Sequence, residues 1–241
     1  MTTLPNGTGQ PSRAAGPAFF PCGKSGLYDL VMGLPILVWS TGLAFLSATA
    51  LHRFVKTADP TLPDPAYYVN IAMQLSVIAF LMLLGVTVVI RKPPVGRMRG
   101  MEPRISALTG TFLIMAIALF PRRELSLPLG IASTLLILTG EGFAIVILMQ
   151  LRSSFSIMPE ARELITSGLY RFVRHPLYLA EEVAAVGSVM QFLSAWTVML
   201  FVLHIAFQLR RIWNEEAVLS QVFPEYNMYK VKTSQILPRI Y

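Results

Sequence analysis

The sequence predicts an all-α integral membrane protein with four transmembrane helices, a C-terminal helical hairpin that folds back, and a polar region facing the cytoplasm. Hydrophobic residues make up 54% of the 241 positions and charged residues 14%, and the mean hydropathy of +0.58 is well above that of an average soluble domain. The apolar residues form runs long enough to cross a bilayer, and the basic residues between them are unevenly distributed. A soluble dehydrogenase, a nucleic-acid-binding protein and a disordered scaffold are excluded.

The few cysteine and histidine residues limit the possible chemistry. Cys22 is the single cysteine, so an internal disulfide and a cysteine-built zinc or iron–sulfur site are excluded. His52, His175 and His204 are far apart in the sequence, and no metal site is predicted. The net charge of +7 is interpreted as the excess of Lys and Arg on one side of a membrane protein, and no nucleic-acid partner is expected.

Residues 1–26 are expected to form a flexible cytoplasmic tail. They carry Pro5, Pro11, Pro17 and Pro21 among several Gly, Ser and Thr residues, a composition typical of an unstructured segment. No small-residue cleavage site follows the first apolar run, so a signal peptide is not predicted.

Residues 27–150 are expected to form four transmembrane helices. At a rise of ~1.5 Å per residue, most of the apolar runs are long enough to span the ~30 Å hydrocarbon core of a bilayer. The third run is short, but Ser126 and Pro128 follow it so closely that the third and fourth runs are predicted to form a tight helical hairpin. The four runs are 27–51, 67–90, 105–120 and 127–151.

A fifth apolar run, 183–209, is predicted to fold back near residues 194–197. With the tail, 91–104, 152–182 and 210–241 on one side, that side holds 16 of the 20 Lys and Arg residues. A single span would leave 11 on one side and 9 on the other, which the positive-inside rule disfavours. Both termini and the polar segments are therefore expected in the cytoplasm.

Polar side chains concentrate in residues 151–241, which include the predicted hairpin. Pro176 is expected to open a helix, and Glu215 and Glu216 are expected at the cytoplasmic membrane surface. Polar groups that face lipid are costly, so a polar stripe on a membrane helix indicates a lined cavity. Four residues at helical spacing form such a stripe: His204, Gln208, Arg211 and Glu215.

Three motifs in this region carry a family resemblance. They are Arg174-His175-Pro176-Leu177-Tyr178, the pair Glu215-Glu216, and residues 223–229 (FPEYNMY) with Pro238 after them. Their order resembles that of the isoprenylcysteine carboxyl methyltransferase family, to which phospholipid N-methyltransferases are related. The resemblance covers 151–241, which is then the catalytic region. It implies an enzyme that binds S-adenosylmethionine in a cytoplasm-facing pocket and admits a lipophilic or lipidated acceptor from the bilayer.

The resemblance and the chemistry of this cofactor suggest binding roles. The paired carboxylates suit its ammonium and ribose hydroxyls, while an imidazole or the amides at a helix start suit its carboxylate. A tyrosine can stack on or hydrogen-bond the adenosine end. The expected cofactor-binding residues are His175, Pro176, Leu177, Tyr178, Glu215 and Glu216.

The expected catalytic residues depend on the acceptor. A carboxylate acceptor needs no general base, and Arg171, Arg174 or Arg211 could orient it. An amine acceptor needs a base, for which Glu141 and Glu182 are candidates. Glu141 is an intramembrane carboxylate, which makes it a functional candidate by default. Arg174, Arg211 and Glu141 are the residues assigned to catalysis.

Each assignment has a structural alternative. Arg174 could be a membrane-flank anchor, His175 a helix cap, Glu141 an inter-helix contact, and the Glu215-Glu216 pair a solvated face matched to neighbouring arginines. Tyr226 and Tyr229 are expected to anchor a C-terminal helix at the membrane interface.

The alternative functions are phospholipid or amine N-methylation, an NADPH-dependent membrane reductase of related fold, and a non-catalytic membrane scaffold. The expected partners are membrane lipids and the lipophilic acceptor. The oligomeric state stays open.

Overall fold

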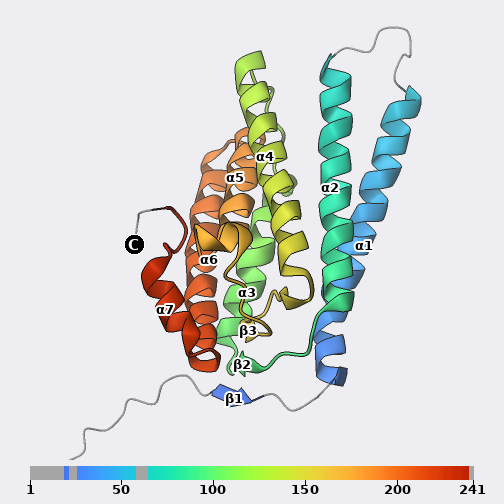
Figure 1. The fold of residues 1–241 in the computed structure, drawn as a ribbon. Helices are drawn as coiled ribbons and strands as arrows, with labels where there is room; N and C mark the ends of the chain where they lie inside the picture. The colour runs from blue at the N-terminus through green and yellow to red at the C-terminus, as the bar shows by residue number, and fades with distance from the viewer. Residues whose placement is uncertain (1–18, 22–25, 58–64, 239–241) are drawn as a thin grey trace, which may run out of the picture.

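The computed structural model describes residues 19–21, 26–57 and 65–238 as an elongated helical bundle with a small sheet at one end (Figure 1). Five segments are long and apolar enough to cross a membrane: Gly33–Thr57, Tyr67–Ile90, Glu102–Leu119, Leu127–Ser154 and Ala195–Val222. Large hydrophobic side chains on these segments, such as Phe45, Val89 and Val202, are exposed, as expected of surfaces that contact lipid. The prediction of an all-α, multi-pass integral membrane protein is confirmed.

Helices α1 (Gly26–Thr57) and α2 (Pro65–Ile90) lie side by side at one edge of the bundle (Figure 1). Gly85 allows their close approach, because a Cβ atom there would lie 3.3 Å from the buried Ser40 Oγ. Helix α2 then packs on α4 (Leu127–Leu151). The buried core between them includes Leu84, Val88, Ile147 and Leu148.

The third and fourth apolar runs have different partners from those expected. Helix α3 (Glu102–Phe112) continues as the 3₁₀ segment η1 (Leu113–Leu119) and packs on α6 (Ala195–Val222). Helix α4 instead packs on α2 and on α5 (Pro176–Gln191). The predicted tight hairpin of the third and fourth runs is therefore wrong, because the stronger apolar contacts of each helix lie elsewhere.

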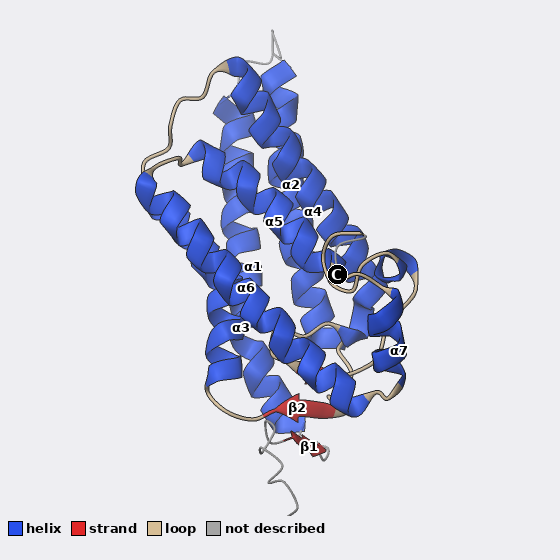
Figure 2. Cartoon of the chain, turned by 90° about the vertical axis from the view of Figure 1, so that its left-hand side faces the viewer, coloured by secondary structure: helices blue, strands red, loops and turns tan. Residues whose placement is uncertain are grey.

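The fifth apolar run turns back between α5 and α6, as predicted (Figure 2). Ser194 caps α6: its Oγ accepts a hydrogen bond from the Thr197 amide at 3.2 Å, and the Thr197 hydroxyl accepts one from the Ser194 amide at 2.9 Å. This reciprocal capping box is a strong signal for a helix start. Contacts across the hairpin pair later residues of α5 with earlier residues of α6, so the two helices are antiparallel.

Helix α5 is held tightly against α4 at two glycines. A Cβ atom on Gly140 would lie 2.5 Å from the Ala184 nitrogen, and one on Gly187 would lie 2.6 Å from the Ser133 carbonyl oxygen. The Ser133 hydroxyl donates a hydrogen bond to the Gly187 carbonyl at 2.8 Å. These contacts fix the helix whose first residues carry the candidate site.

A small antiparallel sheet, which the sequence analysis did not predict, lies at the end of the bundle near α7 (Glu225–Lys232) (Figure 1). Strand β2 (Gly96–Met98) pairs with both β1 (Phe19–Pro21) and β3 (Glu160–Ala161). Strand β1 and Gly26, the first residue of α1, belong to the segment 1–26 that was expected to be a flexible tail. The other residues of that segment lie outside the described residues.

We expect Gly140→Ala and Gly187→Ala to lower the thermal stability of the protein in detergent. The added methyl groups overpack the α4–α5 contact, at a cost of about 1–3 kcal/mol. Gly142→Ala is the matched control, because nothing lies within 4 Å of a Cβ atom there and alanine favours a helix. Equal melting temperatures for all three variants would contradict the packing described.

Candidate functional site

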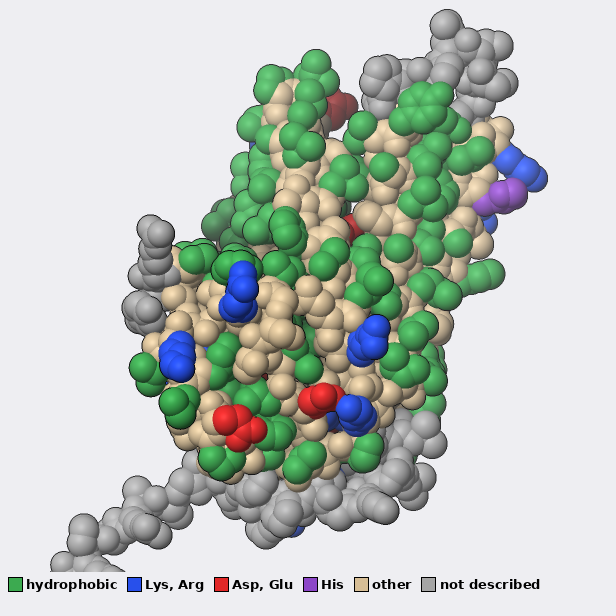
Figure 3. Space-filling view, viewed as in Figure 1, with side chains coloured by type: hydrophobic (Ala, Val, Ile, Leu, Met, Phe, Trp, Pro, Cys, Tyr) green, Lys and Arg blue, Asp and Glu red, His purple; other side chains and the backbone are tan. Residues whose placement is uncertain are grey.

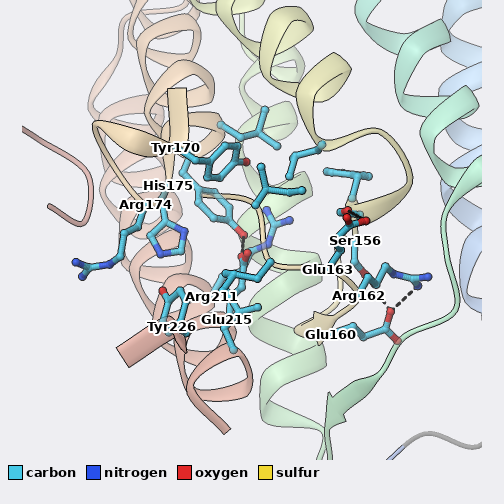
Figure 4. Close-up of a pocket in the computed structure, with 18 of the residues that line it drawn as sticks. Ser156, Glu160, Arg162, Glu163, Tyr170, Arg174, His175, Arg211, Glu215 and Tyr226 are labelled. Carbon is cyan, nitrogen blue, oxygen red and sulfur yellow. Dashed lines mark hydrogen bonds and ion pairs between the residues drawn. The ribbon is translucent and has the colours of Figure 1, made fainter. Parts of the chain in front are cut away.

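A pocket lies where the segment between α4 and α5 meets α6 and α7 (Figure 4). Its empty space is about 730 Å³, part of which is open to solvent. Its lining combines apolar side chains such as Leu151 and Leu177 with aromatic and charged ones. The latter are Phe155, Glu160, Arg162, Glu163, Tyr170, Arg174, His175, Tyr178, Arg211, Glu215, Tyr226 and Tyr229.

The Glu216 carboxylate is the centre of a buried charge cluster beside the pocket. It lies 2.8 Å from Arg174 Nε, 3.1 Å from His175 Nε2 and 2.9 Å from Lys230 Nζ. Glu216 is buried within the protein, with only 4% of the residue exposed, and so does not form part of a solvated helix face. Glu216 is not among the pocket-lining residues, and its oxygens already bind three basic groups.

Arg174 joins the start of α5 to the C-terminal segment. Its Nη1 donates hydrogen bonds to the carbonyl oxygens of Lys230, at 2.9 Å, and Thr233. The backbone amides of Arg174 and His175 donate to the carbonyls of Ser234 and Gln235 at 2.8 and 3.0 Å. The donors of Arg174 are therefore largely engaged within the protein.

The RHPLY motif opens α5, as expected. Pro176 occupies the first turn, where its missing N–H costs nothing. Pro176, Leu177 and Tyr178 are buried, but Pro176 does not line the pocket. The motif thus places His175, Leu177 and Tyr178 at the pocket wall.

Arg211 and Glu215, labelled in Figure 4, form a contact group with Tyr178 at the pocket wall. The Tyr178 hydroxyl donates a hydrogen bond to Glu215 Oε2 at 2.6 Å. The Arg211 Cζ atom lies 4.7 Å from the centre of the Tyr178 ring, within cation–π range. The His175 ring centre lies 5.4 Å from that of Tyr178. The start of α5 and the α6 helix, which are distant in sequence, thus contribute two residues each to this group.

Among the buried polar atoms at the pocket, two that concern the candidate site have no hydrogen-bond partner within the described part of the chain. They are Arg211 Nε and the Tyr226 hydroxyl, in residues that are 4% and 1% exposed. Buried polar atoms are nearly always satisfied by protein, water or ligand, so these two are candidates for binding a ligand or a water molecule. Burial raises the pKa of Tyr226, followed by the effect of the nearby Glu216. Its hydroxyl therefore stays protonated at neutral pH.

The α7 tyrosines are not interfacial anchors, contrary to expectation. Tyr226 is buried, and Tyr229 donates a hydrogen bond to the Tyr170 carbonyl. Burial raises the pKa of Tyr229 to about 12. Both side chains line the pocket, and sequence reasoning missed this because the tertiary fold brings α7 back against α6 and the segment that precedes α5.

The polar stripe predicted on α6 exists and faces α5. His204, Gln208 and Arg211 are buried. His204 Nε2 lies 2.9 Å from Glu182 Oε1, and Gln208 donates a hydrogen bond to Glu181 Oε2 at 3.2 Å. The stripe therefore lines the seam between the two helices of the hairpin.

Glu141 is not brought to the pocket. Its carboxylate accepts a hydrogen bond from the Ser76 hydroxyl of α2, and it precedes the pocket-lining Leu151 by ten residues of α4, or ~15 Å along a helix. This placement agrees with an inter-helix contact. Among the described contacts, Arg210 does not pair with Glu215 or Glu216, because its Nε lies 2.6 Å from Glu102 Oε1.

The pocket has a second charged wall, which no sequence motif predicted. Glu160 and Arg162 form a buried ion pair at 2.7 Å, and Ser156 donates a hydrogen bond to Glu160 at 3.0 Å. The high density of charge in residues 151–182 was the only signal, because these residues match no motif.

We expect Glu216→Gln to destabilise the protein by about 3 kcal/mol, because removing one partner from a buried ion pair leaves the others uncompensated. Glu102→Gln is the matched control. Its pair with Arg210 is half exposed, so the loss should be under about 1 kcal/mol. Unfolding in detergent, followed by circular dichroism, measures both, and equal losses would contradict the central role of Glu216.

Comparison with known proteins agrees with the site. A sequence model of the isoprenylcysteine carboxyl methyltransferase family matches residues 133–221. A search of curated proteins found no match. The matched segment includes all of α5 and nearly all of α6, and thus His175, Tyr178, Arg211 and Glu215. It favours neither the reductase nor the scaffold alternative. The recognised resemblance to this methyltransferase family is confirmed over residues 133–221.

Proposed function

We propose that the pocket binds S-adenosylmethionine and that the protein transfers its methyl group to a lipophilic carboxylate of the isoprenylcysteine type. The observation that carries the proposal is the pairing of opposite charges in one pocket: Arg211 presents an unpartnered Nε, and Glu215 a carboxylate held only by Tyr178 among the described contacts. A zwitterionic cofactor and an anionic acceptor need both charges.

The pocket residues fit the groups of this cofactor. The Glu215 carboxylate would bind the ammonium, and the His175 ring and the Tyr226 hydroxyl would bind polar atoms that need a donor. Aromatic rings such as Tyr178 and Tyr170 offer stacking surfaces for the adenine. Glu216, which the sequence analysis assigned to the cofactor, would act by holding His175 and Arg174 in place.

The chain contributes binding, orientation and the exclusion of water. When bound, S-adenosylmethionine supplies an electrophilic methyl group on a sulfonium. A carboxylate acceptor is already nucleophilic, so no general base is needed, and Arg211 would bind one acceptor oxygen through Nε–H while the other remains free to react. The apolar lining at Leu151, Phe155 and Leu177 would desolvate the reacting groups, which favours transfer.

We propose that the acceptor enters from the bilayer and that the pocket faces the cytoplasm. Charged side chains gather near the α7 end in Figure 3, and hydrophobic side chains cover much of the same face beyond them. The side that carries 16 of the 20 Lys and Arg residues would then be cytoplasmic. An acceptor with an apolar tail could stay in lipid while its polar group reaches the pocket.

Single-cysteine labelling tests this orientation. In a Cys22→Ser background, we expect cysteines at Ser153 and Ser220 to be protected from an impermeant thiol reagent in intact cells. A cysteine at Ser126, in the exposed loop before α4 at the opposite end of the bundle, should react. Labelling at Ser220 from outside would overturn the cytoplasmic placement of the site.

Titration with S-adenosylhomocysteine in detergent tests the cofactor site. We expect Glu215→Gln and Tyr226→Phe each to weaken binding, Glu215→Gln by about tenfold or more, since hydrogen bonds to charged groups contribute about 1.5–3 kcal/mol. Glu102→Gln, remote from the pocket lining, should bind as the unaltered protein does. Unchanged affinity in both pocket variants would remove these residues from the site.

The reaction class is tested by supplying labelled S-adenosylmethionine and, separately, NADPH to the protein with a lipid extract. Label in a base-labile methyl ester supports the proposal. Label in a base-stable amine would point to N-methylation. Oxidation of NADPH would support a reductase, and the absence of both turnover and cofactor binding would support a scaffold.

A further inference from the structure

We infer that Gln208 and Glu181 are positioning residues that hold the Arg211 guanidinium in place at the pocket wall. The inference deepens the proposed function, on which it rests, because it identifies what fixes the group that would orient the acceptor. Neither residue lines the pocket, so neither touches the reacting atoms directly.

A chain of three side chains links α5 to Arg211. Gln208 Nε2 donates a hydrogen bond to Glu181 Oε2 at 3.2 Å, and Arg211 Nη1 donates one to Gln208 Oε1 at 3.4 Å. A primary amide has one accepting oxygen and one donating nitrogen. It is therefore suited to stand between a carboxylate and a guanidinium, and Glu181 sets which way the amide points.

The opposite contact of Arg211 completes the orientation. Its guanidinium lies over the Tyr178 ring, with Cζ 4.7 Å from the ring centre, while Nη1 binds Gln208. Two contacts on a planar group restrain its plane and its rotation. Nε is left without a partner among the described residues.

Helix α3 confines the Gln208 amide from a third direction. A Cβ atom on Gly110 would lie 3.0 Å from Gln208 Oε1 and 3.3 Å from the Phe207 carbonyl carbon. Glycine at this position leaves room for the amide. A side chain at 110 would press on Gln208 without reaching the pocket lining.

A purely structural role explains this arrangement poorly. Arg211 is buried, and within the described residues it forms no ion pair at salt-bridge distance. Burying a charge without a direct counterion is costly, and apolar side chains of similar size stabilise such an interface at least as well. A guanidinium that is held in place to bind an anionic ligand explains the arrangement better.

The kinetic test uses N-acetyl-S-farnesyl-L-cysteine as the probe acceptor, with the full-length protein in nanodiscs. We expect Gln208→Leu and Glu181→Leu to raise the acceptor KM or lower kcat/KM by about tenfold or more, with S-adenosylhomocysteine affinity changed less than about twofold. Glu181→Gln retains an oxygen that accepts from Gln208 and should restore most of the activity. Glu102→Gln, whose pair with Arg210 is half exposed and which does not line the pocket, is the matched control.

Magnetic resonance of the arginine Nε–H groups tests the positioning itself and needs no acceptor. We expect the Arg211 signal, assigned by its loss in Arg211→Lys, to be distinct in the unaltered protein. It should move toward the positions of exposed arginines in Gln208→Leu, and shift in Gly110→Ala. The Arg174 signal should not change, because its partners are Glu216 and the C-terminal carbonyls.

The outcomes separate this inference from the proposed function. An unaltered protein that does not methylate the probe counts against the carboxylate proposal, while the magnetic resonance data still decide the positioning role. Activity with the probe, together with an unchanged Arg211 signal and unchanged kinetics in Gln208→Leu, overturns the inference alone. Loss of both the Arg211 and Arg174 signals would indicate general unfolding and would also count against it.

Discussion

The site depends on one buried carboxylate. Glu216 of α6 binds Arg174 and His175 at the start of α5 and Lys230 of α7, so a single side chain connects three separate elements of the fold. Among these partners, the Arg174 guanidinium is itself held by the carbonyl oxygens of Lys230 and Thr233. These ion pairs hold His175 and Tyr178 at the pocket wall. Loss of any one partner would leave a buried charge uncompensated and destabilise the site.

The hairpin of α5 and α6 divides its polar residues between two tasks. Near the proposed membrane surface, Tyr178, Arg211 and Glu215 present charge and aromatic surface to the pocket. Farther along the hairpin, Gln208 binds Glu181 and His204 contacts Glu182, which removes these groups from lipid. The two glycine contacts of α5 with α4 hold the hairpin against the rest of the bundle, and thus connect lipid-facing helices to the chemistry.

Periodicity and motifs predicted much of the site because they report local geometry. The α6 stripe follows from helical spacing alone, and the fold-back agrees with the distribution of charge. The roles of Glu215 and Glu216 could not be separated, since adjacent residues on a helix point in directions ~100° apart and only the neighbouring elements decide which side is pocket and which is buried cluster. For the same reason Glu141 matched an intramembrane candidate by sequence, yet its nearest partner is Ser76 of another helix.

The amino-acid sequence by itself determined that this is a helical membrane protein, where its main helices lie, and which segment carries the family motifs. Those properties depend on composition and on spacing within one element. The tertiary structure decided that α3 pairs with α6, that α7 returns to bury Tyr226, and that Glu160 and Arg162 form a second wall of the pocket. Such contacts join residues far apart in the chain, and no local pattern encodes them, because their free energy depends on how whole helices pack.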